Sequence, residues 1–106
     1  MKKSFLFFGL FVFRGLFCQT SFELNRTIEW ADYYFINENY EEAILKYLSI
    51  DDYITIDARR NLAKSYAKTG ALKKAEKILR PIVDSNDAIV LDYYHFASYI
   101  TENESL

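Results

Sequence analysis

Glycine, proline, cysteine and histidine are all scarce in this sequence of 106 residues, which holds three Gly, one Pro, one Cys and one His. So few turn-forming residues argue against a β-sandwich or barrel, which needs a turn about every 8 to 12 positions. A single Cys excludes an internal disulfide framework, and one Cys with one His cannot build a structural zinc site. We therefore expect no metal site and no cofactor.

The first 18 residues have the features of an export signal. Lys2 and Lys3 supply a positive start, and a largely apolar run extends from Phe5 to Phe17. Such a run spans about 20 Å as a helix, whereas the apolar core of a bilayer is about 30 Å thick. The sequence therefore predicts a signal peptide over 1–18 rather than a membrane span.

The end of this leader allows two interpretations. Cleavage after Cys18 makes Gln19 the new N-terminus, whereas in a lipoprotein Cys18 itself carries the lipid. Gly15 and Phe17 are not the residues that lipidation favours at these positions, so cleavage is the preferred interpretation. Cleavage leaves 10 basic and 15 acidic residues, a net charge of −5, which makes a nucleic-acid partner unfavourable.

An internal repeat organises the remaining sequence. Small residues recur where paired helices cross closely, and large apolar residues recur where they fill the space between pairs. Ala97 matches Ala63 at a slightly longer spacing than the other pairs have. The pairs that share one constant spacing are Ala31 and Ala63, Tyr34 and Tyr66, Tyr40 and Leu72, Ala43 and Ala75, Tyr47 and Leu79, and Ile50 and Ile82.

On these residues, together with Trp30, Leu62 and Gly70, the chain resembles the tetratricopeptide repeat family. The resemblance implies an all-α fold, in which helix-turn-helix repeats stack as a right-handed α-solenoid of about two and a half repeats. The repeat domain would span 19–106, with repeats at 24–57 and 56–89 and an incomplete third at 90–106. We expect Tyr34, Tyr40, Tyr47 and Tyr66 to pack in its core.

Local signals place the helices. Thr20 and Glu23 form a capping box before the first helix, Asp57 is the expected cap of the third, and Gly70 suits a left-handed turn. Pro81 lacks a backbone donor, so the fourth helix should kink or end early. The expected helices cover about 21–36, 40–50, a segment from Asp57 to near Lys68, 71–83 and 88–100.

The fifth helix is apolar nearly all round, although terminal repeats need a polar outer face. In the repeat frame, residues 103–106 correspond to the turn before a second helix. We therefore expect the chain to be the N-terminal part of a longer protein. The alternative is a complete short protein that associates with itself through the fifth helix.

No catalytic constellation is visible, and we expect the chain not to be an enzyme. His95 is the only histidine and lies between Tyr94 and Phe96. No Ser or Cys nucleophile is spaced to use it, so a packed or surface histidine is the simpler interpretation.

Charge is segregated along the chain. Residues 21–57 carry a net charge of −7, residues 58–80 a net charge of +7, and residues 81–106 a net charge of −5. In the resembled family the first helix of each repeat lines the ligand-binding face. The residues that this implies for a peptide-binding site are a basic stripe, Arg60, Lys64 and Lys68, with Asp32, Phe35 and Tyr94 beside it. An acidic or C-terminal peptide segment would fit this stripe; the alternative is a solvated face.

The predicted function is a secreted, non-catalytic protein–protein interaction or scaffold module. A signal peptide followed by such repeats resembles the N-terminal region of bacterial OmpA-family envelope proteins, which implies the periplasm or outer membrane of a Gram-negative bacterium. Membrane attachment would then come only through a missing downstream domain or a lipid on Cys18. The alternatives are a periplasmic peptide-binding co-chaperone and a repeat module attached to an enzyme whose catalytic domain lies beyond residue 106.

Overall fold

The computed structural model describes residues 22–105, and this part of the chain is all-helical, without strands. The predicted signal peptide, Cys18 and the Thr20 capping residue lie outside the described residues. A first helix covers 22–36 of this range. It is followed by α2 (Tyr40–Leu48), a 3₁₀ turn η1 (Asp51–Tyr53), α3 (Ile56–Lys68), α4 (Leu72–Val83) and α5 (Val90–Ser105).

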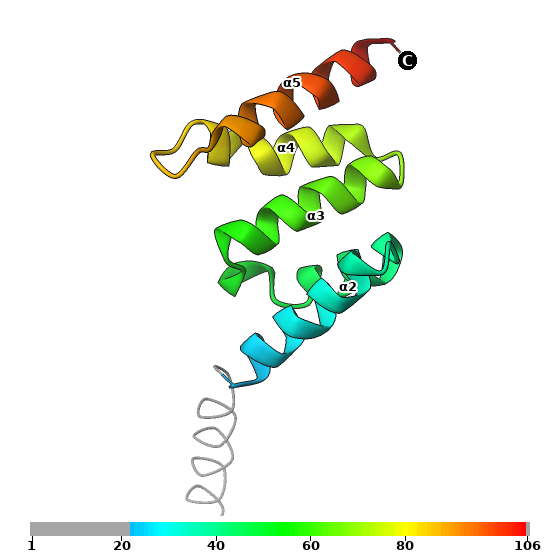
Figure 1. The fold of residues 1–106 in the computed structure, drawn as a ribbon, viewed down its shortest axis with the longest axis vertical. Coiled ribbons are helices and arrows are strands. Elements are labelled where there is room, and N and C mark those ends of the chain that lie inside the picture. Colours follow the sequence, from blue (N-terminus) through cyan, green and yellow to red (C-terminus); the bar gives the residue numbers. More distant parts are fainter. Residues whose placement is uncertain (1–21, 106) are drawn as a thin grey trace, which may run out of the picture.

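The helices lie side by side in chain order (Figure 1). Within the described range, α3 packs on both α2 and α4, and α5 packs on α4. Successive helices run in opposite directions because each connection is short. The prediction of an all-α fold is therefore confirmed.

The two tight inter-helix turns repeat each other bond for bond. In the first, the backbone amides at positions 37, 38 and 39 donate to the carbonyls at 33, 35 and 34; in the second, the amides at 69, 70 and 71 donate to the matched carbonyls at 65, 67 and 66. The central residue has a positive φ in both, 61° at Glu38 and 90° at Gly70. The predicted left-handed turn at Gly70 is thus confirmed, and a Glu occupies the equivalent position in the first turn.

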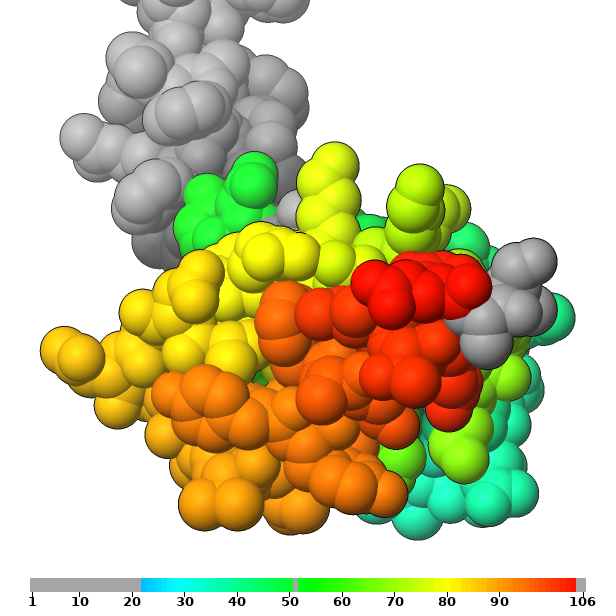
Figure 2. Space-filling view, turned by 90° about the horizontal axis from the view of Figure 1, so that it is seen from above, coloured from blue at the N-terminus to red at the C-terminus, as the bar shows by residue number. Residues whose placement is uncertain are grey.

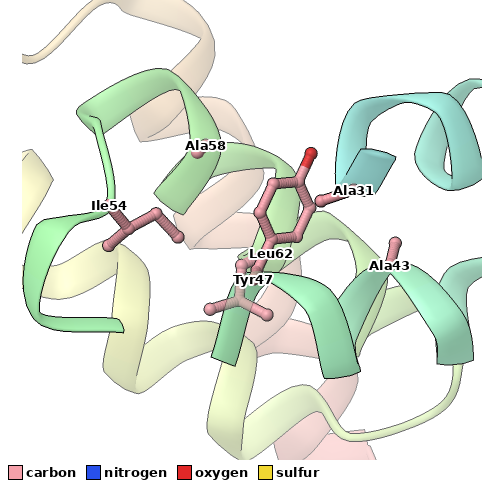
Figure 3. Close-up of a cluster of buried hydrophobic side chains, with 6 residues drawn as sticks. All are labelled: Ala31, Ala43, Tyr47, Ile54, Ala58 and Leu62. Atoms are coloured by element: carbon pink, nitrogen blue, oxygen red, sulfur yellow. The ribbon is translucent and has the colours of Figure 1, made fainter. Parts of the chain in front are cut away.

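The apolar core follows the same period. The residues at four matched positions are buried in both copies, and their exposed fractions are at most 9%. In the first cluster, Tyr47 of α2 lies between Ala31 of the first helix and Ala58 and Leu62 of α3 (Figure 3). Tyr66 packs against both the first cluster and the second, which forms around α4. The buried pairs are Ala31 and Ala63, Ala43 and Ala75, Tyr47 and Leu79, and Ile50 and Ile82.

Two local predictions were wrong, and one of the two effects expected of Pro81 is excluded. Thr55, not Asp57, caps α3: its side-chain oxygen accepts a hydrogen bond from the Ala58 amide at 3.2 Å. The fourth helix was expected to kink or end early at Pro81; it does not end early, since it continues through Pro81 to Val83, the predicted bound. The fifth helix begins at Val90 and continues to Ser105, so residues 103–105 are helical and do not form a turn. Without Gly or Pro beyond residue 81, nothing in the local sequence stops that helix.

Candidate peptide-binding groove

A cavity of about 180 Å³ lies between the first helix, α3 and α5. Phe35 forms one wall, Asn61 and Lys64 of α3 contribute polar groups, and residues of α5 form the opposite wall. Its lining consists of Phe35, Arg60, Asn61, Lys64, Leu79, Ile89, Leu91, Asp92, His95 and Tyr99.

The structure brings together three of the six predicted site residues, Phe35, Arg60 and Lys64, at this groove. Asp32, Lys68 and Tyr94 are not among its lining residues. The basic stripe is therefore not a uniform binding surface, and each of its members has a different environment.

Arg60 is committed to an ion pair within the protein. Its Nε lies 2.9 Å from Oδ1 of Asp92, and one terminal nitrogen lies 3.0 Å from Oδ2 of the same carboxylate. The other terminal nitrogen donates to Asp57 at 2.8 Å, and the first also donates to the carbonyl of Asp87 at 2.8 Å. The hydrogen bonds to Asp92 raise the pKa of Arg60. Asp92 therefore largely neutralises the charge of Arg60, and the role of Arg60 in ligand binding stays a prediction.

Asp92 is almost fully buried, with 2% of its side chain exposed. Burial alone would raise the pKa of this carboxyl, but hydrogen bonds from Arg60 and from the Ile89 amide at 2.9 Å outweigh it and lower the pKa. Asp92 is therefore a carboxylate that joins α5 to α3.

Asp32 also serves an internal contact. Its Oδ1 accepts a hydrogen bond from the hydroxyl of Tyr47, and Asn61 Nδ2 lies 3.3 Å from that hydroxyl and 3.4 Å from Oδ1. Burial, followed by the hydrogen bond to Asp32, raises the pKa of Tyr47 well above its usual value. Asp32 thus links the first helix to α2 and α3, and its part in a binding site stays a prediction.

Lys64 is the basic residue of the stripe that remains open to solvent at the groove. Its side chain is exposed, and its Nζ lies 5.8 Å from the centre of the Phe35 ring, within range of a cation–π contact. Lys68, one turn further along α3, is exposed outside the groove. Lys64 and Phe35 together present a cation beside an aromatic face.

The wall contributed by α5 differs from the prediction. Tyr94 is 68% exposed and does not line the groove, whereas Leu91, His95 and Tyr99 do. The His95 ring stacks on Tyr99, with centroids 6.1 Å apart and planes 8° from parallel. Residues 91, 95 and 99 have the same i, i+4, i+8 spacing that identified the basic stripe on α3. This spacing could have predicted that they line one wall of the groove.

The described residues 22–105 contain no group of three His, Cys, Asp or Glu side chains able to hold a metal ion. None of the helices in this range is long and apolar enough to cross a membrane. No family model matches the sequence, and no curated protein or solved structure is significantly similar to it.

Proposed function

We propose that this chain is a non-catalytic protein–protein interaction module built from tetratricopeptide-like repeats that stack as a right-handed α-solenoid. The repeat period supports this architecture, since the same positions are buried and the same turn bonds form in both copies. An array of this type exposes one flank of successive helices as a continuous binding surface.

The groove between the first helix, α3 and α5 is the proposed binding site. The observation that carries the proposal is the pairing of an exposed lysine with apolar and aromatic walls: Lys64 stands beside Phe35, opposite Leu91 and His95. Because Asp92 neutralises Arg60, Lys64 supplies the positive charge available to a ligand there. A cavity of about 180 Å³ is smaller than a pocket for a drug-sized ligand.

The ligand class follows from this lining. One apolar or aromatic side chain fits the walls, and a neighbouring carboxylate fits Lys64, so the ligand is a short acidic peptide segment. An exposed ion pair contributes only about 0.2–1 kcal/mol, so apolar contacts supply most of the affinity.

The cellular setting belongs to the same proposal. The leader supports export, and we propose a module of the Gram-negative envelope, in the periplasm or associated with the outer membrane. A role as part of an OmpA-family protein rests on the resemblance of the sequence alone.

The test is binding of the full chain to an array of short peptides that vary in acidic and aromatic content. Lys64→Ser should weaken binding of acidic peptides by up to about fivefold, and high salt should abolish that difference because exposed charges are screened. Lys77→Ser is the matched control, since Lys77 is an exposed lysine on α4 that does not line this groove. Equal binding by the two variants would refute the groove as the site.

A further inference from the structure

Helix α3 is covered on two sides, and α5 is covered on one. On its first side, Leu62 of α3 is 1% exposed and packs in the cluster that contains Tyr47 of α2, and Ser65 is 0% exposed. Phe96 and Tyr99 are their counterparts when Ala97 is aligned with Ala63, and they pack into the cluster around α4. The first side of each helix is therefore buried by the helix that precedes it.

The second side of the two helices differs. Ala63 of α3 is 1% exposed because it packs in the cluster formed with α4, where Tyr66 and Ala67 also lie. Its counterpart Ala97 is exposed, and Figure 2 shows α5 lying across this end of the molecule. The exposed or half-buried residues that form what we call the outer face of α5 are Val90, Tyr93, Tyr94, Ala97, Ile100 and Thr101.

The chain itself contains two examples of what covers this side. The cluster of Ala31 in the first helix includes Ala43 of α2, and the cluster of Ala63 includes Ala75 of α4. Ala43 and Ala75 are both 0% exposed, and a large buried residue follows each of them four positions later. In both cases the covering element is an antiparallel amphipathic helix with a small residue at the crossing point.

The charge of this part of the chain indicates which kind of helix fits the outer face of α5. Residues 81–106 contain five acidic residues and no Lys or Arg. Asp92 is paired with Arg60, and the four exposed acidic residues are Asp84, Asp87, Glu102 and Glu104. A second copy of α5 would bring acidic segments together, which is unfavourable. A helix with basic residues beside its apolar stripe, as in α4 with Lys73 and Lys77, complements the face.

We propose that the outer face of α5 is a docking site for a basic amphipathic helix, which crosses α5 in the antiparallel direction with a small residue against Ala97. This site is separate from the groove and does not depend on the peptide-binding proposal. The helix has the pattern of α4: a small residue at the crossing and a large apolar residue four positions later.

The test uses the chain's own covering helix as the probe. When Ala97 is aligned with Ala63, residue 104 corresponds to Gly70. In the test variant, a copy of residues 70–84 therefore replaces residues 104–106 of the full chain. If the copied helix docks as α4 docks on α3, we expect the melting temperature to rise by about 5 °C or more. Ala97→Glu should remove this rise, whereas in the chain without the copied helix Ala97→Glu should leave the melting temperature nearly unchanged because Ala97 is exposed.

Two controls distinguish the alternatives. A copied helix in which Glu replaces the small residue that lies against α5 should give no rise in melting temperature. The proposal is overturned if the copied helix has no effect, or if Ala97→Glu leaves its effect intact. It is also overturned if the chain without the copied helix sediments as a dimer that Ala97→Glu dissociates, since a second copy would then be the occupant.

Discussion

The segments 31–50 and 63–82 have the same scaffold and different polar chemistry. Their small and large core positions are buried alike, and their turns make the same hydrogen bonds. Two of the matched positions at which they differ are informative: Tyr47 stands where Leu79 does, and Glu38 where Gly70 does. The repeated core and turn positions give both helix pairs the same shape. The polar side-chain contacts between helices, in contrast, are not repeated from one pair to the next.

The polar links on the two sides of α3 also differ in kind. On one side the Tyr47 hydroxyl, Asp32 and Asn61 connect α3 to the first helix and α2. On the other side the ion pair of Arg60 and Asp92 connects α3 to α5. Acid and alkali should therefore weaken opposite ends of the molecule.

The largest difference between the two segments should come from their matched tyrosines. Tyr66 packs against both apolar clusters, whereas Tyr34 packs against the first. Tyr66→Ala should lower the free energy of unfolding by about 3 kcal/mol, because a large aromatic is removed between two clusters. Tyr34→Ala should cost clearly less, as measured by urea denaturation. Equal losses would mean that Tyr66 does not connect the clusters.

Asp92→Asn should reduce the free energy of unfolding by about 1.5–3 kcal/mol, since a neutral amide with one acceptor oxygen replaces the buried carboxylate that binds the Arg60 guanidinium through both oxygens. Asp57→Asn is the control: Asp57 binds the same arginine, but its side chain is 90% exposed, so the change should be small. Urea denaturation at neutral pH measures both variants, and equal losses would contradict the buried ion pair.

Acid should remove the difference between Asp92→Asn and the unaltered chain. The pKa of Asp92 is lower in the folded state than the unfolded value of about 3.9. The carboxylate therefore stabilises the fold above about pH 4, and this contribution is lost as pH falls below that value. Thermal unfolding of both proteins between neutral pH and pH 2 measures it; a constant difference across this range would contradict the ion pair.

Tyr47→Phe should cost about 1–2 kcal/mol, because it removes the hydroxyl that donates to Asp32 in a buried site. The pKa of Tyr47 is raised in the fold, so neutral Tyr47 stabilises the protein below about pH 10 and this contribution disappears as pH rises above it. Alkaline denaturation should therefore begin at higher pH in Tyr47→Phe. An unchanged alkaline midpoint would show that another group controls it.

The smallest effects should come from the turns, and they should have opposite signs. Glu38→Gly relieves a positive φ at a non-glycine residue and should raise the free energy of unfolding by about 1 kcal/mol. Gly70→Ala should lower it by a similar amount because of its φ of 90°, although a Cβ there meets no atom within 4 Å. A destabilised Glu38→Gly variant would indicate that the Glu38 side chain is required.

Much of the fold was predictable because it depends on local chemistry. The positions of Ala31, Ala43 and Ala75, the turn at Gly70 and the end of α3 at Lys68 all follow from periodicity and turn preferences. Thr55 was missed because two polar residues near the start of α3 were both able to cap it, and only the backbone conformation at Thr55 distinguishes them.

The site was less predictable because it depends on partners that are distant in sequence. Arg60 and Asp92 lie on different helices, and no local pattern indicates that they meet. Tyr94 was chosen from the repeat frame, but the groove is closed by the flank of α5 that carries Leu91 and His95. A shift of three residues along a helix, from position 94 to 91, rotates a side chain by about 60° around the axis.

The Arg60 guanidinium has a further consequence for cooperativity. In a linear stack each helix contacts only its immediate neighbours, so terminal elements fray independently. Arg60 reaches past α4, binding both Asp92 and the Asp87 carbonyl in the segment before α5. Fraying of the first turn of α5 therefore leaves Arg60 of α3 with only its exposed partner Asp57. This contact couples the opening of the last helix to the middle of the array, and the two should unfold together.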